Sequence, residues 1–215
     1  MIVINFKTYK QSTGENSVKV AEACEKAMKE TGTEIVVAPQ PQDILRFKGL
    51  ETPVFSQHLD PVEPGSHTGS ILAEGIKQAG ATGTLINHSE RRMDPDTVEK
   101  AVEKAREHDI TSIVCAQSPE ECGKLSEFEP DYIAFEPPEL IGGDVSVSSA
   151  KPGLIEEAVE QSGDIPTLTG AGIKDSEDVR ISLDLGCEGV LVASGVVKSE
   201  NCLEAVKELC KGYEK

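Results

Sequence analysis

The chain has 215 residues, 38 of them acidic and 21 basic, and its formal net charge is −17. A surface of this charge repels nucleic acids and anionic membranes, so we expect neither as a partner. No apolar run approaches the roughly 18 residues that a membrane-spanning helix needs, and we see no signal peptide. The six cysteines form no C-x-x-C pair and no zinc-type cluster, which predicts reduced thiols, no metal site and a cytoplasmic protein.

Apolar runs alternate with amphipathic stretches along the whole chain. Eight runs are typical of short buried strands: 2–6, 34–38, 53–57, 83–87, 112–116, 132–135, 167–169 and 189–193. The helical stretches between them include 17–30, 96–108, 153–161, 176–185 and 201–211. This alternation predicts a parallel sheet covered by helices, and eight repeats predict one α/β domain, a (β/α)8 barrel over residues 1–215. An open doubly wound sheet is the alternative, but no G-x-G-x-x-G follows the first strand.

The least regular segment is 58–70, which contains two prolines and two glycines and follows the third predicted strand. Loops of this length inside compact domains are usually functional. The segment also has few large apolar residues with which to pack against its own barrel. We therefore expect this loop to do more than connect two elements.

Two strings that carry chemistry follow predicted strands. His88 comes directly after the run 83–87, and Glu136 comes directly after the run 132–135. In a parallel barrel the carboxyl ends of the strands form the active-site face. An imidazole and a carboxylate that converge there suit proton transfer to and from carbon and oxygen. Taken alone, a core histidine and a solvated loop glutamate are the plainer interpretations.

Six distinctive strings occur along the chain: Asn5-Phe6-Lys7, GSHTG at 65–69, NHSERR at 87–92, Phe135-Glu136-Pro137, TGAGI at 169–173 and GVLVASG at 189–195. In this order they resemble the triosephosphate isomerase family, most closely its short archaeal branch. The resemblance covers the whole chain and implies a TIM barrel. It also implies the interconversion of dihydroxyacetone phosphate and D-glyceraldehyde 3-phosphate through an enediol(ate), in glycolysis and gluconeogenesis, with no cofactor and no metal.

The resemblance assigns catalytic roles to three residues. Glu136 would be the general base, and His88 would be a neutral imidazole that moves protons between the substrate oxygens. Neutrality would follow if the backbone amides near Ser89 and Glu90 point at the other ring nitrogen. Lys7 would stabilise the oxyanion and the phosphate, because a chain at −17 needs a local positive site for an anion. We expect Glu90 to pair with Lys7.

The resemblance also implies a phosphate-binding set and a neighbouring subunit. The substrate-binding residues would be Asn5, Lys7, Ile141, Gly142, Gly143, Gly172, Ala193 and Ser194. Ser89 and Glu90 would support them, together with Thr68 from the third loop of the neighbouring subunit, close to that neighbour's Asn5 and Glu90. The expected partners are thus a small phosphorylated triose and further copies of the chain, in a homodimer or homotetramer.

Three departures from the wider family agree with the archaeal branch. Residues 137–140 lack an aromatic residue, Thr169 replaces a tyrosine, and Ala193-Ser194 replaces a pair of glycines. Two alternatives remain open. The Gly-x-Gly at 170–172 would also permit another phosphate-binding barrel enzyme, although the histidine and glutamate strings argue against it. A catalytically silent barrel that binds a partner is the other, and the intact Asn5, Lys7, His88 and Glu136 argue against that.

Overall fold

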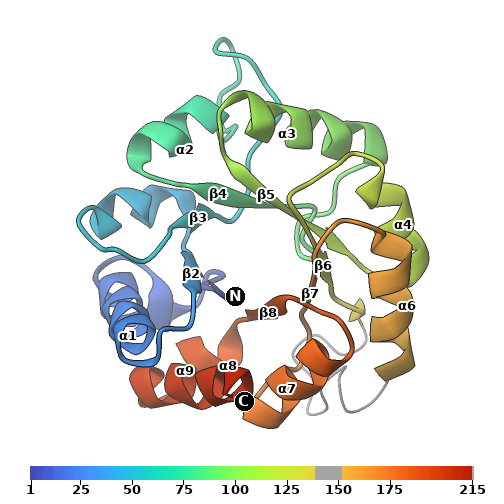
Figure 1. Ribbon diagram of the computed structural model, residues 1–215. Helices are drawn as coiled ribbons and strands as arrows, with labels where there is room; N and C mark the ends of the chain where they lie inside the picture. The colour runs from blue at the N-terminus through green and yellow to red at the C-terminus, as the bar shows by residue number, and fades with distance from the viewer. Residues whose placement is uncertain (139–151, 215) are drawn as a thin grey trace.

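The computed structural model describes residues 1–138 and 152–214, and in it a ring of parallel strands is surrounded by helices (Figure 1). The predicted strands are present at the expected places in the chain. Their bounds are β1 Ile2–Asn5, β2 Ile35–Ala38, β3 Phe55–Ser56, β4 Gly83–Ile86, β5 Thr111–Ala116, β6 Tyr132–Phe135, β7 Thr167–Thr169 and β8 Gly189–Val192.

The strands follow one another around the ring in the order β2-β1-β8-β7-β6-β5-β4-β3, and every pair is parallel. A parallel bridge between Val37 and Val54 joins β2 to the segment just before β3. There the Val37 N–H donates to the Pro53 carbonyl at 3.0 Å. The first and last strands of the order are therefore in contact. The predicted (β/α)8 barrel is confirmed, and the alternative of an open doubly wound sheet is wrong.

Helices cover the outside of the ring. They are η1 Lys10–Ser12, α1 Glu15–Thr31, η2 Pro41–Phe47, α2 Ala73–Ala79, α3 Pro95–Glu107, α4 Pro119–Ser126, α6 Pro152–Ser162, α7 Ser176–Asp184, α8 Ser194–Val197, α9 Cys202–Cys210 and η4 Lys211–Tyr213. The five predicted helical stretches correspond to α1, α3, α6, α7 and α9 within two residues at each end. Short helices such as α2 and α4 lacked enough apolar residues at helical spacing to be predicted.

The core has two layers because successive strand residues point to opposite faces of the sheet. Val3, Leu85 and Leu168 belong to the cluster inside the barrel, whereas Ile2 and Ile4 pack in the layer between sheet and helices. Gly83 is needed inside the barrel, since a Cβ there would lie 2.4 Å from the ring of Phe55. Close packing inside the ring fixes the strands, and so fixes where their carboxyl ends lie.

Several strands end earlier than predicted. Phe6, Asn87 and Ala193 were expected in strands but lie just beyond β1, β4 and β8. The backbone leaves the extended conformation there, with φ of 46° at Lys7 and 62° at Asn87. β3 has two residues instead of the five predicted, and its expected first residue is a proline, which has no N–H to donate to a ladder.

The two ends of the chain are tied together. The Tyr213 hydroxyl donates to the Met1 carbonyl at 2.8 Å and accepts from the Met1 ammonium at 3.2 Å. The ammonium also donates to the Glu188 carbonyl at 3.1 Å. η4 therefore holds the beginning of β1 against the segment that leads into β8.

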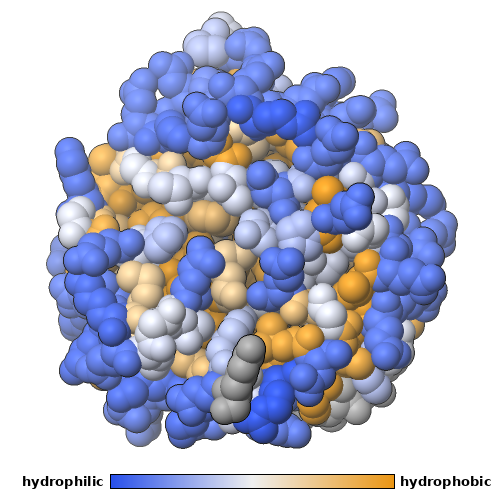
Figure 2. Space-filling model, viewed as in Figure 1, coloured by the Kyte–Doolittle hydropathy of each residue, from blue (hydrophilic) through white to orange (hydrophobic). Residues whose placement is uncertain are grey.

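The surface view shows hydrophilic residues around the periphery of one face, with hydrophobic residues gathered between them toward the middle (Figure 2). The loop after β3 projects from the body at the top of Figure 1. It is held at its base by the Asp60 N–H, which donates to the Ile71 carbonyl at 2.8 Å. No helix among the described residues is long and apolar enough to cross a membrane.

Candidate functional site

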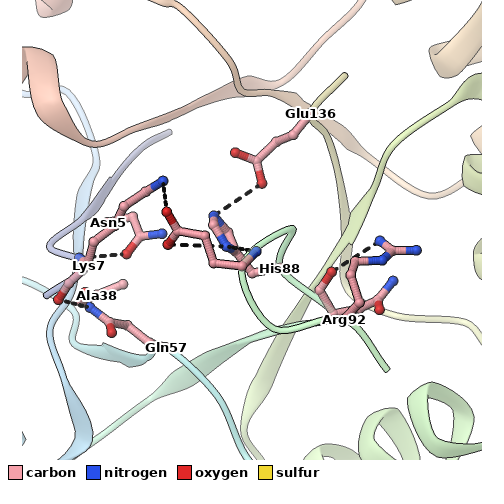
Figure 3. Close-up of polar contacts among 9 residues, drawn as sticks. Asn5, Lys7, Ala38, Gln57, His88, Arg92 and Glu136 are labelled. Carbon is pink, nitrogen blue, oxygen red and sulfur yellow. Dashed lines mark hydrogen bonds and ion pairs between the residues drawn. The ribbon is translucent and has the colours of Figure 1, made fainter. Parts of the chain in front are cut away.

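Lys7 lies directly after β1 in a left-handed backbone conformation, with φ of 46°. That conformation costs a non-glycine residue about 1–2 kcal/mol, so its surroundings must hold it. The Lys7 N–H donates to Asn5 Oδ1 at 3.0 Å, and Gln57 Nε2 donates to the Lys7 carbonyl at 3.0 Å. Gln57 also donates to the Ala38 carbonyl at 2.9 Å (Figure 3). The sequence singled out Asn5 as a substrate-binding residue but gave no distinguishing signal for Gln57.

The ammonium of Lys7 points at the loop after β4. Its Nζ donates to Glu90 Oε1 at 2.9 Å, which is the expected contact. The Lys7 side chain is 12% exposed and that of Glu90 is 60% exposed. Lys7 is thus a largely buried cation whose partner is reached by solvent, so an anionic ligand can compete for its charge.

His88 is held by the same loop. The Glu90 N–H donates to His88 Nδ1 at 3.1 Å, so Nδ1 acts as an acceptor and the proton of the neutral ring lies on Nε2. This matches the expectation that a backbone amide points at one ring nitrogen. Nε2 faces the carboxylate of Glu136, with Oε2 at 3.6 Å (Figure 3). The structure therefore brings together the two residues that the sequence singled out.

His88 and Glu136 are both 6% exposed, yet His88 Nε2 and Glu136 Oε2 have no hydrogen-bond partner among the described residues. The Ser89 hydroxyl beside them is also buried and unpartnered in that part of the chain. Most buried polar atoms are hydrogen-bonded, and leaving one unpaired costs about 1–3 kcal/mol. A buried donor and a buried acceptor that face each other beyond hydrogen-bond distance are suited to a ligand that pairs with both.

A set of contacts behind His88 fixes its loop. Asn87 has φ of 62°, donates from Nδ2 to the Cys115 carbonyl at 3.0 Å and accepts from the Met93 N–H at 3.0 Å. Arg92 donates to the Asn87 carbonyl at 3.3 Å and forms an ion pair with Glu121. Asn87 and Arg92 belong to the quoted histidine string, but their supporting roles were not predicted.

Glu136 is positioned by Ala116 at the end of β5 and by Gly170, which directly follows β7. Its N–H donates to the Ala116 carbonyl at 2.8 Å. Gly170 lies against its side chain so closely that a Cβ there would be 2.5 Å from Glu136 Cγ and 2.8 Å from Oε1. Burial and the adjacent negative charge of Glu136 raise the pKa of the Cys115 thiol. Gly170 was seen as part of a loop motif, but its contact with Glu136 is evident only in three dimensions.

A cavity of about 130 Å³ opens beside Glu136. Its lining joins the ends of β1, β6, β7 and β8 and consists of Asn5, Lys7, Tyr9, Glu136, Ala171, Gly172, Ile173, Lys174, Leu191, Val192, Ala193, Ser194 and Gly195. Five predicted site residues besides Glu136 are thus together: Asn5, Lys7, Gly172, Ala193 and Ser194. Tyr9 and Lys174 were missed, because neither lies in a distinctive string.

The other predicted residues lie elsewhere. Ile141, Gly142 and Gly143 fall outside the described residues. Thr68 is exposed on the projecting loop and does not line the cavity of its own subunit. His58 has a structural role, since it is buried and its Nε2 pairs with Asp60 Oδ1 at 3.0 Å. Burial lowers the pKa of His58 despite that hydrogen bond.

Comparisons with known proteins agree in pointing to one family. A family profile described as triosephosphate isomerase matches residues 1–209. A protein named triosephosphate isomerase from Methanothermus fervidus is 47% identical over 215 residues, which are 97% of this chain and 96% of that one. The protein of the same name from Methanocaldococcus jannaschii is 47% identical over 216 residues, covering 98% and 99% of the two chains.

A comparison with solved structures gives a similar fold. The crystal structure of triosephosphate isomerase from Bartonella henselae superposes with a TM-score of 0.78 at 20% sequence identity. The match covers 100% of this chain and 98% of that one. At this identity the likeness bears on the barrel alone.

Proposed function

The chain belongs to the triosephosphate isomerase family, and we propose that its site interconverts dihydroxyacetone phosphate and D-glyceraldehyde 3-phosphate through an enediol(ate). The chain is an enzyme of the intramolecular isomerase class. One observation supports the proposed chemistry above all others. His88 Nε2 and Glu136 Oε2 are buried, unpartnered within the described residues and 3.6 Å apart. A carboxylate and an imidazole N–H arranged in this way can act on a carbon and its adjacent oxygen in one ligand.

In the proposed reaction Glu136 removes the proton from the carbon next to the carbonyl and later returns it to the neighbouring carbon. His88 donates its Nε2 proton to the carbonyl oxygen and takes a proton back from the other oxygen. No atom is gained or lost, and Glu136 and His88 carry every proton transfer, so the proposed steps call for no cofactor and no metal. Lys7 stabilises the negative charge that develops on oxygen, because its ammonium lies in a low-dielectric site close to both groups.

We propose that the phosphate lies in the cavity of about 130 Å³, away from His88. Asn5 and Lys7 form one wall, and Gly172, Ala193 and Ser194 form another. Parallel barrels often bind phosphate at the ends of the seventh and eighth strands. Ile141, Gly142 and Gly143 stay part of the proposed binding set on the sequence resemblance alone.

The test is an isomerase assay of the purified protein with D-glyceraldehyde 3-phosphate, followed by the variant Glu136→Asp. The shorter side chain withdraws the carboxylate by one methylene, and a misplacement of about 1 Å costs on the order of 10²-fold in rate. The exposed Glu99 on α3 offers a matched control, Glu99→Asp, which should leave kcat unchanged. An unchanged kcat in Glu136→Asp would refute the assignment of the base. Turnover of another sugar phosphate alone would favour the other barrel enzyme, and binding without any turnover would favour the silent barrel.

We further propose that the active form is a homodimer or homotetramer built through the loop 58–70, with Thr68 reaching the neighbouring site. The residues from 63 to 70 are all exposed in the single chain, and Lys104 on α3 pairs with Glu63 in the loop. A hollow of about 370 Å³ lies on the other side of Lys7 and His88, where a neighbour's loop could enter.

Replacing 61–68 by a short glycine-rich turn should give a folded monomer with little activity, because Lys7 and His88 would lose that support. Sedimentation and the isomerase assay together decide the matter. A fully active monomer, from wild type or from the deletion, would contradict the proposal.

We also propose that residues 1–215 act as one catalytic domain in the cytoplasm, within glycolysis and gluconeogenesis. All six cysteines are free thiols, and only Cys202 is more than slightly exposed. Free thiols persist in a reducing compartment. The net charge of −17 supports the expectation that nucleic acids and anionic membranes are not partners.

A further inference from the structure

One contact links the lining of the cavity beside Glu136 to the end of α8, the helix whose first residue also lines that cavity. Tyr9, from the segment that follows β1, lines the cavity, and Lys198 Nζ lies 4.3 Å from the centre of its ring. This distance is within the roughly 6 Å over which a cation is attracted to an aromatic face. Lys198 directly follows α8, and its N–H donates to the Ser194 carbonyl at 3.1 Å. Ser194 lines the opposite wall, so the contact joins the Lys7 segment to the wall that α8 provides.

Several hydrogen bonds hold the segment that carries Lys7 and Tyr9. Asn5 and Gln57 hold the strained backbone of Lys7 itself, as described above. Farther along, the Ser12 hydroxyl donates to the Phe6 carbonyl at 2.7 Å and to the Tyr9 carbonyl at 3.2 Å. In addition to these hydrogen bonds, the ring of Tyr9 contacts Lys198, the residue that follows α8. Lys198 therefore links the segment to the α8 wall.

Lys198 also brings a positive charge to the ring of Tyr9. Lys7 shares its charge with Glu90 at 2.9 Å, whereas Lys198 makes no ion pair with any residue in 1–138 or 152–214. Among the described residues no carboxylate offsets this positive charge, which lies over a ring that lines the cavity, in a chain with a net charge of −17. Such a charge raises the local concentration of an anionic ligand and strengthens its binding.

We propose that Tyr9 and Lys198 form a cation–π clasp that positions the Lys7 segment against α8 and sets the affinity of the cavity for a phosphate dianion. Both are positioning residues, and the proposal rests on the proposed function in placing the substrate's phosphate there. The plainer alternative is that Tyr9 only covers the core, in which case its contact with Lys198 would not affect phosphate binding.

The experiment is a double-mutant cycle with Lys198→Met, Tyr9→Leu and the two combined. The inhibition constant of inorganic phosphate, KM and kcat are measured, together with direct binding of inorganic phosphate by calorimetry. Each single change should raise the phosphate inhibition constant and KM about two- to fivefold, since an exposed cation–π contact is worth about that factor. The kcat should stay near the wild-type value. The double variant should bind phosphate no more weakly than the weaker-binding of the two single variants.

Three matched variants separate the clasp from other effects. Lys198→Arg and Tyr9→Phe retain a cation and a ring, so both should bind phosphate as the wild type does. Lys100→Met on α3 removes a charge from an exposed position far along the chain and should change nothing.

Wild-type phosphate affinity in Lys198→Met, or additive losses in the double variant, would overturn the clasp. A loss of phosphate affinity in Lys198→Met without a loss in Tyr9→Leu would also overturn the clasp. It would mean that only the charge of Lys198 affects phosphate binding. A wild-type protein without isomerase activity would overturn the proposed function instead, while the calorimetric cycle would still decide whether the clasp sets phosphate affinity.

Discussion

Gly170→Ala displaces the side chain of the proposed base, Glu136, without changing its carboxylate. The added Cβ would lie 2.5 Å from Glu136 Cγ, whereas ordinary contacts begin at 3.4 Å. The Glu136 side chain must therefore move by about 0.9 Å, because hydrogen bonds hold the backbone on both sides. The Gly170 N–H donates to the Phe135 carbonyl at 2.9 Å, and the Glu136 N–H donates to the Ala116 carbonyl at 2.8 Å. A displacement of about 1 Å in a catalytic group costs on the order of 10²-fold in rate. We expect kcat in the isomerase assay to fall by about that factor.

The fold should tolerate the change. Gly170 does not have a positive φ, so alanine meets no backbone strain there, and the atoms that must yield belong to a flexible side chain. The free energy of unfolding, measured by denaturant titration, should change by less than about 1 kcal/mol. Gly153→Ala at the start of α6 is the control, since a Cβ there meets nothing within 4 Å. A Gly170→Ala enzyme with wild-type kcat would refute the argument that Gly170 sets the position of Glu136.

Lys7→Met should weaken the binding of inorganic phosphate by about 10- to 100-fold, because a charged hydrogen bond is worth about 1.5–3 kcal/mol. The control variant Lys10→Met should leave phosphate binding unchanged. Equal losses of affinity in calorimetry would mean that Lys7 is not the phosphate-binding lysine. His88 should give the ¹⁵N NMR signature of a neutral ring protonated on Nε2, because the Glu90 N–H occupies Nδ1; an imidazolium signal near neutral pH would contradict this. Tyr213→Phe should lower the melting temperature by about 2–6 °C, because it removes the partly buried hydrogen bonds to Met1 at 2.8 and 3.2 Å. An unchanged thermal transition would show that these bonds do not stabilise the fold.

The sequence by itself determined the barrel and the identity of its chemical groups. Each buried run was apolar enough to be recognised locally, and the alternation of eight such runs with five helical stretches left little choice of architecture. His88, Glu136 and Lys7 each follow a strand in a distinctive string, so their place on the active-site face could be predicted. The pairing of Lys7 with Glu90 was predicted from the same strings and is present at 2.9 Å.

Only the tertiary structure decided how those groups are held. The contact of Gly170 with Glu136 and the bonds from Gln57 to the Lys7 and Ala38 carbonyls each join different strand ends. Such contacts leave no periodic or local pattern in the chain, because they depend on the closure of the ring. The left-handed backbone at Lys7 and Asn87 could not be predicted either, since neither residue is a glycine, the residue that usually indicates this conformation. Long-range packing imposes these conformations, which is why the residues could be predicted from the sequence and their geometry could not.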